Sequence, residues 1–402
     1  MNFSLSENPQ SSTEVAVLIV GAGPAGLGCA AALKQCGIEN LAIVDLREVG
    51  ASFDSWPAQM RMISPSFHSN PFGQADLNAI TPHTSPADFI HSEHPTGPEY
   101  AHYLRAVADY YQFDIRTGIE ITGIEKSGSR LLAAGNPESF RAKHVIWTAG
   151  EFFFPRDTIR GSEHCLHNSA VTDWSELPGV EHAIIGGFES GIDAAVHLAR
   201  LGKSVHVLSR GEPWHQDSPD PSRALSPFTI DRLKEVLRSA PGSVRFYKNA
   251  NIVEVARSGE NYFLIDEEGE PFEISTPPIL CTGFRGGLGP VASAFEDTDG
   301  NRFFTEDADE SPALPNLYYS GPLLQHRQSL FCYIYKFRAR FGVIARTIAD
   351  RLGVGWEEPL KQWKERGFMI EDLSCCEDCT CAVENEEKEA PAEVEDFATV
   401  SR

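Results

Sequence analysis

The residues with the clearest chemical meaning are glycines that stand between a strand pattern and a helix pattern. Gly21, Gly23 and Gly26 follow the β-branched run 15–20 and precede an apolar segment of helical pattern. The first glycine permits a tight bend, the second lets the backbone approach a phosphate, and the third lets the helix pack closely on the strand. Because the helix N-terminus adds a positive dipole, this turn predicts a site for the pyrophosphate of a dinucleotide.

Two features around this turn support that prediction. Asp45 closes the next strand pattern and stands 19 residues after Gly26, near the offset at which a carboxylate holds a ribose hydroxyl. Pro24 falls in the first helical turn, where its missing N–H is harmless because that N–H has no partner within a helix. Strand, turn, helix, strand and acid together form the context that a dinucleotide-binding unit requires.

A second turn of the same kind spans residues 186–191, again between a strand pattern and a helix pattern. Phe188 departs from the motif because it stands where the middle glycine belongs. The strand after this turn ends in Ser209 and Arg210 instead of an acid, and a basic residue there suits the 2′-phosphate of NADPH, which favours NADPH over NADH. The residues expected to bind NADPH are Gly186, Gly187, Glu189, Ser190, Gly191, Ser209, Arg210, Thr282 and Gly283.

The two turns begin halves of similar order, which indicates an internal duplication. Each half runs through a hairpin pattern to a strand that ends in a Thr- and Gly-containing sequence, at 148–150 and at 282–283. We therefore predict an α/β fold of two nested Rossmann-like domains, with a long helix over 331–352 where the chain returns to the first domain. The expected parts are a split domain of residues 14–155 and 285–370, an inserted domain of residues 156–284 and a tail of residues 371–402.

Composition and charge limit the classes of partner. The 402 residues carry 34 basic and 57 acidic side chains, a formal charge of −23, and apolar residues make up 42%. The apolar fraction supports a sizeable core, whereas the excess of acid argues against nucleic acid or an anionic membrane as the main partner. No stretch approaches 18 apolar residues, and residues 1–14 lack a signal-peptide pattern. We expect a cytoplasmic protein that acts on a small molecule, with a homodimer left open.

The C-terminal residues 371–402 combine acid with clustered cysteine. They hold eleven acidic residues against two basic ones and carry −9 of the total charge. Their Glu-, Ala- and Pro-rich end is typical of disorder. The clustered cysteines are Cys375, Cys376, Cys379 and Cys381. Four thiols in seven residues could hold a soft metal ion or relay electrons, and the sequence leaves both hypotheses open beside that of an incidental cluster.

Together with the strand ends at 148–150 and 281–284, the two turns resemble those of flavoproteins with two dinucleotide-binding domains, over about residues 14–355. The resemblance implies FAD in the split domain, NAD(P)H in the inserted domain and hydride transfer between them. Residues 50–56 resemble the Gly-Gly-Thr-Trp segment of flavin-containing monooxygenases, and Gly321–Pro322 replaces the usual Gly-Asp of the family. The residues expected to bind FAD are Gly21, Gly23, Pro24, Ala25, Gly26, Asp45, Ser52, Trp56, Arg61, Thr148, Ala149, Gly150, Gly321 and Pro322.

The first functional hypothesis is an FAD-dependent NADPH oxidoreductase of monooxygenase type that oxygenates a soft nitrogen or sulfur nucleophile. It rests on the resemblance and on the absence of the cysteines that related reductases use. No Cys-x-x-Cys pair stands between residues 150 and 283, where Cys165 is far from any other cysteine, and Ala25 stands where one bacterial branch of thiol-disulfide reductases has its cysteine. The monooxygenase fingerprint itself is partial, because His164 and His167 follow Gly161 at other spacings.

Two further hypotheses remain. One is an NAD(P)H-dependent reductase of a low-molecular-weight disulfide, quinone or metal ion that uses the tail cysteines. The other is a redox-sensing flavoprotein. Two polar loops, 57–96 and 212–228, could shape a substrate site, because long loops in a compact domain are usually functional or disordered. No single residue is predicted to be catalytic.

Overall fold

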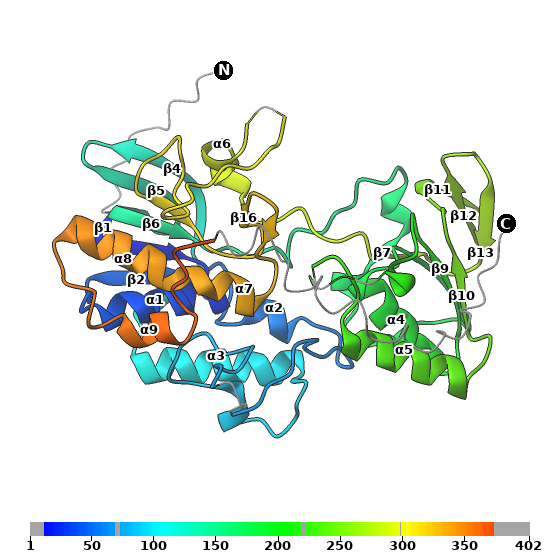
Figure 1. The fold of residues 1–402 in the computed structure, drawn as a ribbon. Coiled ribbons are helices and arrows are strands. Elements are labelled where there is room, and N and C mark those ends of the chain that lie inside the picture. Colours follow the sequence, from blue (N-terminus) through cyan, green and yellow to red (C-terminus); the bar gives the residue numbers. More distant parts are fainter. Residues whose placement is uncertain are drawn as a thin grey trace, which may run out of the picture.

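A computed structural model of the chain describes residues 12–68, 73–216, 218, 220, 222–297 and 299–373. The chain forms two lobes that lie side by side (Figure 1). The blue and cyan N-terminal part and the orange C-terminal part share one lobe, and the green middle part forms the other. The second lobe is thus inserted between two parts of the first.

The first lobe is built on one sheet of mixed direction. In the described chain, its strands are β1 (Thr13–Val20), β2 (Leu41–Val44), β3 (Ile115–Arg116), β4 (Glu120–Ser127), β5 (Arg130–Asn136), β6 (Phe140–Trp147) and β15 (Leu317–Tyr319). β3, β2, β1, β6 and β15 run parallel, and β4 and β5 add an antiparallel hairpin. β6 pairs with β5 along its first half and with β15 along its second, since Ala142 faces Leu131 whereas Val145 faces Leu317.

The second lobe repeats this plan with a smaller parallel sheet. Its strands lie in the order β10 (Val244–Tyr247), β9 (Ser204–Leu208), β8 (Glu181–Ile185), β14 (Ile279–Leu280) and β7 (Leu166–His167). A separate antiparallel sheet contains β11 (Ile252–Ser258), β12 (Asn261–Asp266) and β13 (Pro271–Ile274). The sequence predicted the hairpin of β11 and β12 but missed β13, whose four residues carry little alternation.

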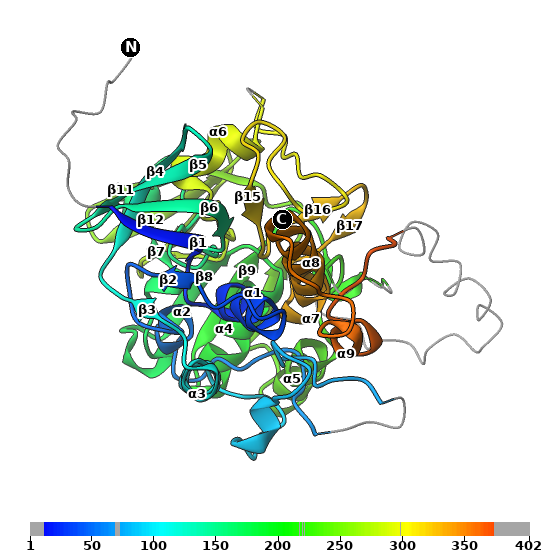
Figure 2. The same ribbon diagram turned by 90° about the vertical axis from the view of Figure 1, so that its left-hand side faces the viewer.

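Helices cover the sheets, and one short hairpin precedes the last helices. The helices of the described chain are α1 (Pro24–Gln35), α2 (Ala51–Asp54), α3 (Gly97–Tyr111), α4 (Glu189–Arg200), α5 (Pro227–Ser239), α6 (Ala292–Phe295), α7 (Ile334–Phe337), α8 (Phe341–Leu352) and α9 (Lys361–Glu365). The hairpin is formed by β16 (Gln325–His326) and β17 (Ser329–Leu330). Viewed from the side of the first lobe, α1 lies between α3 and α8 and contacts both (Figure 2). Residues 25–33 of α1 are all buried, and most of them are Gly, Ala or Cys. Their small side chains allow neighbouring elements to pack closely against α1.

The long helix predicted over 331–352 is wrong in its first part. α7 begins at Ile334, residues 338–340 form a 3₁₀ turn, and α8 then runs to Leu352. Buried arginines accompany the break: Arg338 donates to the carbonyl oxygens of Asp76 and Ala79, and Arg340 donates to both carboxylate oxygens of Asp309. A buried guanidinium must meet its acceptors wherever they lie, so we attribute the altered helical path to these contacts.

Two chain crossings connect the lobes and are bonded to each other. Pro155 and Phe284 form an antiparallel bridge. The N–H of Arg156 donates to the carbonyl oxygen of Gly283 at 3.0 Å, and the N–H of Arg285 donates to that of Phe154 at 2.8 Å. The outgoing and returning segments therefore form one short ribbon.

Two further expectations concern the C-terminal tail and membrane-spanning helices. The cluster Cys375, Cys376, Cys379 and Cys381, and nearly all of the predicted tail, lie outside the described residues. Among the residues that are described, no helix is both long enough and apolar enough to cross a membrane.

The contact between α1 and α8 gives a first prediction. A Cβ on Gly28 would lie 2.0 Å from the ring of Phe341, so Gly28→Ala must force the two helices apart. Overpacking of this kind costs about 1–3 kcal/mol, more than the roughly 0.5–1 kcal/mol that alanine gains over glycine within a helix. We expect a lower midpoint of thermal unfolding for Gly28→Ala. The control Gly355→Ala, at an exposed position with nothing within 4 Å, should leave the midpoint unchanged; equal midpoints for the two variants would contradict the prediction.

Candidate functional site

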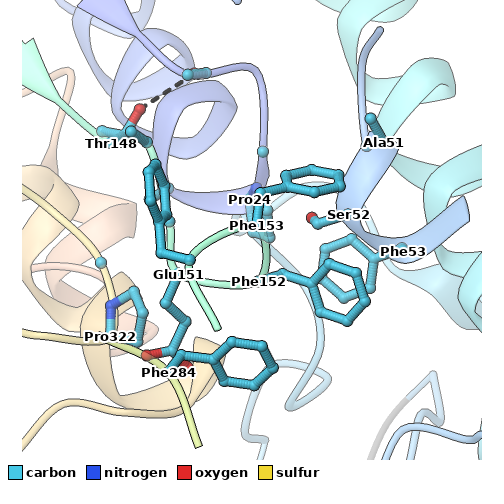
Figure 3. Close-up of a pocket in the computed structure, with 18 of the residues that line it drawn as sticks. Pro24, Ala51, Ser52, Phe53, Thr148, Glu151, Phe152, Phe153, Phe284 and Pro322 are labelled. Atoms are coloured by element: carbon cyan, nitrogen blue, oxygen red, sulfur yellow. Dashed lines mark hydrogen bonds between the residues drawn. The ribbon is translucent and has the colours of Figure 1, made fainter. Parts of the chain in front are cut away.

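The first glycine turn joins β1 to α1 and lies against the end of β6. Gly21 has a φ of +118°, and a Cβ there would lie 2.4 Å from the carbonyl oxygen of Thr148. A Cβ on Gly26 would lie 1.9 Å from the carbonyl oxygen of Gly21. The hydroxyl of Thr148 donates to the carbonyl oxygens of Val20 and Gly21, at 2.8 and 3.1 Å (Figure 3). A Cβ on Gly23 would meet nothing within 4 Å, so the turn leaves open space at the position where a phosphate is expected.

Asp45 follows β2 and fixes the turn from the side. Its Oδ2 accepts a hydrogen bond from the N–H of Ala22 at 2.7 Å, and its Oδ1 accepts one from the N–H of Arg47 at 2.7 Å. Burial raises the pKa of the Asp45 carboxyl, and these two hydrogen bonds lower it in part. The carboxyl also lines the cavity described below, as a ribose-binding group would have to do.

The second glycine turn repeats the geometry of the first. Gly186 has a φ of +111°, and a Cβ there would lie 2.3 Å from the carbonyl oxygen of Cys281. A Cβ on Gly191 would lie 1.9 Å from the carbonyl oxygen of Gly186. Phe188 caps α4 with φ −93° and ψ −164°, close to the values of Gly23 at the start of α1, −92° and −169°. The chain therefore contains two turns of the same design, each packed against the end of a parallel strand.

The second turn differs from the first where a nucleotide would approach. Ser209 has the place that Asp45 has in the first lobe, because each directly follows the strand beside the turn. A Cβ on Gly187 would lie 2.8 Å from the ring of Trp214 and 2.9 Å from the Cβ of Ser209, so this position is covered. Arg210 is exposed at the end of β9. The second turn thus offers a cation instead of a carboxylate.

A cavity of about 590 Å³ extends from the first turn to the start of α4. Of the residues predicted to bind FAD, those that line it are Gly21, Gly23, Pro24, Ala25, Asp45, Ser52, Trp56, Arg61, Thr148, Ala149, Gly150, Gly321 and Pro322. Gly26 lies behind the turn and packs against Gly21. Of the residues predicted to bind NADPH, Glu189 and Ser190 line the cavity. The predicted residues that lie elsewhere are Gly186, Gly187, Gly191, Ser209, Arg210, Thr282 and Gly283.

Thr282 and Gly283 belong to the connection between the lobes. The hydroxyl of Thr282 donates to the carbonyl oxygen of Arg156 at 2.6 Å. The ring Nε2 of His167 lies 3.1 Å from the carbonyl oxygen of Gly283. Both residues therefore make contacts within the connection between the lobes, and neither lines the cavity.

An aromatic wall of the cavity was not predicted from the sequence. Phe152, Phe153 and Phe154 follow the strand end 148–150 and line the cavity, and the guanidinium carbon of Arg47 lies 3.7 Å from the ring centroid of Phe153. Figure 3 shows Phe152 beside Phe53, across from Pro322. Three consecutive aromatic residues directly after a strand expected to end at a cofactor were the signal that could have revealed this wall.

Glu151 is a second missed residue of this wall. Its side chain extends toward Phe284 and Pro322 in Figure 3. Burial raises the pKa of the Glu151 carboxyl, and the charges of Arg302 and Arg156 lower it in part. This wall therefore combines a titratable carboxyl with apolar rings.

Two buried acceptors of the cavity lack a donor. Asn168 is 2% exposed and its Oδ1 has no hydrogen-bond partner. Asp193 is 6% exposed; its Oδ1 accepts from Arg232 at 2.7 Å, whereas its Oδ2 has no partner. Buried polar atoms are nearly always hydrogen-bonded, so these two acceptors are exceptions among the side chains of the residues that line the cavity.

Both predicted substrate loops reach the other lobe. From loop 57–96, the amide of Gln59 donates to the carboxylate of Asp173 at 2.6 Å, and the ring of His94 stacks on that of Phe228 with centroids 3.6 Å apart. In loop 212–228, the Oδ1 of Asp220 accepts a hydrogen bond at 2.6 Å from the ammonium group of Lys336, which belongs to the first lobe. These contacts hold the two lobes together beside the cavity.

The cysteines of the described chain occupy different environments. Cys29, Cys36 and Cys281 are buried, and Cys165 is half-buried. Cys332 is also half-buried and, of the described cysteines, it alone lines the cavity. Within the described ranges no group of three or more His, Cys, Asp or Glu side chains could hold a metal ion.

Two glycine turns of one design, each packed against the end of a parallel strand and joined by one cavity, place the chain among the flavoproteins that have two dinucleotide-binding domains. Residues 18–321 match the family of pyridine nucleotide-disulphide oxidoreductases. The chain belongs to this family.

Known proteins of more than one activity share this architecture. Bacilliredoxin reductase of Bacillus subtilis (strain 168) is 22% identical over 356 residues, which cover 83% of this chain and 97% of that protein. The structure of bacillithiol disulfide reductase from Staphylococcus aureus aligns with a TM-score of 0.69 and 19% identity, over 84% of this chain and 99% of that chain. A flavin-containing monooxygenase from Stenotrophomonas maltophilia aligns with a TM-score of 0.65 and 16% identity, over 85% and 99%. These structural similarities establish the fold and do not separate reductase from monooxygenase.

The position of Asp45 gives a second prediction. Asp45→Asn should weaken the binding of FAD by about ten- to a hundredfold, because a hydrogen bond to a charged group contributes roughly 1.5–3 kcal/mol. The dissociation constant can be measured from flavin fluorescence after the protein has been stripped of flavin. Asp114→Asn, at an exposed carboxyl paired with Arg116, serves as the control. Equal affinities of the two variants for FAD would contradict a role of Asp45 in binding.

Proposed function

We propose that the chain is an NAD(P)H-oxidising flavoprotein that binds FAD in the first lobe and NADPH at the second glycine turn. One observation carries the proposal: the cavity that begins at the first turn ends at Glu189 and Ser190, the first residues of the helix behind the second turn. A flavin held in the first lobe would therefore extend toward a nucleotide held by the second. The enzymes of this family use FAD and NAD(P)H.

The residues present fit FAD. The open space over Gly23 and the N-terminus of α1 suit the pyrophosphate, and Asp45 suits the ribose of the adenosine part. Arg47 and Phe153 form a stacked wall beside it. When bound, FAD supplies two-electron chemistry, taking a hydride from the nicotinamide and passing the electrons to an acceptor.

We infer that the acceptor is a low-molecular-weight disulfide. Support comes from a thiol that lines the cavity, Cys332, although the first glycine turn has Ala25 in place of a cysteine. The family and the similarity to a bacilliredoxin reductase agree with disulfide chemistry. The sequence alone placed second a broader hypothesis, a reductase of a disulfide, quinone or metal ion that uses the tail cysteines, because the inserted domain has no Cys-x-x-Cys pair.

A monooxygenase remains the second candidate. The observation in its favour is that the aromatic wall, extended by Phe284, gives one side of the cavity an apolar surface, as a site that must exclude water requires. A soft nitrogen or sulfur nucleophile would then be the substrate, and oxygen the electron acceptor.

A titration separates these possibilities. We expect the purified protein to be yellow and its flavin absorbance to be bleached by NADPH under anaerobic conditions. A reductase should then recover its colour on addition of a small disulfide and only slowly in air. Rapid recovery in air, with NADPH consumption coupled to an oxygenated product, would identify the monooxygenase instead. A protein that binds no flavin after reconstitution would refute the proposal as a whole.

Arg210 gives a prediction about the nucleotide. Arg210→Gln should raise the KM for NADPH by about ten- to a hundredfold and leave the KM for NADH nearly unchanged, because only NADPH has the 2′-phosphate. Steady-state kinetics with both nucleotides measures this difference. Arg200→Gln, at an exposed residue paired with Glu235, is the matched control. If Arg210→Gln affects both nucleotides equally, the 2′-phosphate is bound elsewhere.

A further inference from the structure

Glu151 is a cavity-lining acid whose carboxyl has no partner inside the described chain. Its side chain is half-buried and extends toward Phe284 and Pro322 (Figure 3). No hydrogen bond or ion pair of the described residues reaches this carboxyl, and the guanidinium groups of Arg302 and Arg156 act on it as charges at a distance. A carboxyl held against apolar rings loses part of its hydration, so a hydrogen-bond donor from a ligand would stabilise it.

The other acidic side chains of the cavity already have partners or water. They are Asp45, Glu120, Glu189 and Asp193. Glu120 is exposed, and the other three accept hydrogen bonds from groups of the protein, at 2.7 Å in each case. Glu151 is thus the cavity acid that is both sheltered from water and unbonded within the described chain.

The order of the strands locates Glu151 relative to the other parts of the first lobe's site. β2, β1, β6 and β15 lie next to one another in that order and run parallel, so their carboxyl ends share one edge of the sheet. Asp45 directly follows β2, and the glycine turn directly follows β1. Glu151 stands four residues after the last residue of β6, and Pro322 stands three residues after the last residue of β15. Asp45 therefore lies on one side of the turn, and Glu151 and Pro322 lie on the other.

This order matches the order of groups along FAD. In FAD the pyrophosphate stands between the ribose of the adenosine part and the ribityl chain, which carries hydroxyl groups. With the ribose at Asp45 and the pyrophosphate at the glycine turn, the ribityl chain falls on the side of Glu151 and Pro322. A hydroxyl donates a strong hydrogen bond to a carboxylate, and this chain has proline where the family usually has aspartate. Glu151 can therefore supply the acceptor that Pro322 lacks.

We propose that the carboxylate of Glu151 accepts a hydrogen bond from a ribityl hydroxyl of FAD, and that it replaces in this role a carboxylate at position 322. The inference rests on the proposed function, because it needs FAD in the first lobe. It assigns a ligand contact to the segment that leads from β6 to the ribbon at Pro155 and Phe284. The flavin would thus be held by the same segment that takes the chain into the second lobe.

Binding of FAD to the full chain, after removal of its flavin, tests the proposal. Glu151→Gln keeps the shape of the side chain but removes its charge, so the dissociation constant for FAD, measured from flavin fluorescence, should rise about ten- to a hundredfold. Glu125→Gln, at an exposed acid of β4, is the matched control and should leave the dissociation constant unchanged. Pro322→Asp, added to Glu151→Gln, restores a carboxylate on the same side of the turn and should recover most of the lost affinity.

A change in the ligand gives a second measurement, which does not depend on the folding of a variant. The wild-type chain is titrated with analogues of FAD that each lack one hydroxyl of the ribityl chain. The analogue without the hydroxyl that Glu151 accepts should bind the wild-type chain about ten- to a hundredfold more weakly than FAD does. That analogue and FAD should bind Glu151→Gln with nearly equal dissociation constants, because the variant has already lost the hydrogen bond.

Weaker binding of FAD to Glu151→Gln, together with this loss of discrimination against one analogue, supports the proposal. If Glu151→Gln binds FAD as tightly as Glu125→Gln does, the proposal is overturned, and the proposed function stands because the wild-type chain binds FAD. If Glu151→Gln weakens FAD and every analogue by the same factor, the carboxylate does not contact these hydroxyls and the proposal is also overturned. A double variant that binds FAD no better than Glu151→Gln would overturn the exchange between positions 151 and 322. A wild-type chain that binds no FAD would refute the proposed function itself.

Discussion

The architecture depends on one contact, made twice, in which a glycine turn presses its backbone against the end of a parallel strand. Gly21 meets Thr148 in the first lobe and Gly186 meets Cys281 in the second. Because no side chain separates the two backbones, each helix start is held at a fixed place above its sheet. The cavity, the acid at Asp45 and the cation at Arg210 all take their positions from these two contacts.

The sequence could predict what local geometry determines. The spacing of glycines, the strand before them and the position of Asp45 follow from backbone requirements within about 30 residues, and the structure reproduces them. It could not predict the rest of the cavity wall. Glu151 and Cys332 lie about 180 residues apart, and their common cavity results from the return of the chain to the first lobe. The prediction of one continuous helix over 331–352 was wrong for a related reason. The hydrogen-bond acceptors of Arg338 and Arg340, at the break, lie in distant segments of the chain.

The two lobes share one fold around their glycine turns but place side chains of opposite charge beside them. Where the first has a carboxylate beside its turn, the second has a serine followed by an exposed arginine, and the open position of Gly23 is filled by Phe188. Under the proposed function, the first turn would meet a ribose hydroxyl deep in the cavity, and the second would meet a phosphate near the surface. A net charge of −23 does not oppose such binding of anionic nucleotides, because backbone N–H groups and single cations act over short distances while the remaining acids are screened by salt.

The ribbon at Pro155 and Phe284 also fixes the lengths of the two segments that connect the lobes. The outgoing and returning segments are bonded to each other through Arg156 and Gly283, so neither can be lengthened without disturbing the register of the other. A residue inserted in one segment would need a matching residue in its partner, or would have to bulge out of the ribbon. The span between the two glycine turns, and with it the reach required of any molecule that bridges them, is therefore fixed by a few residues that belong to neither turn.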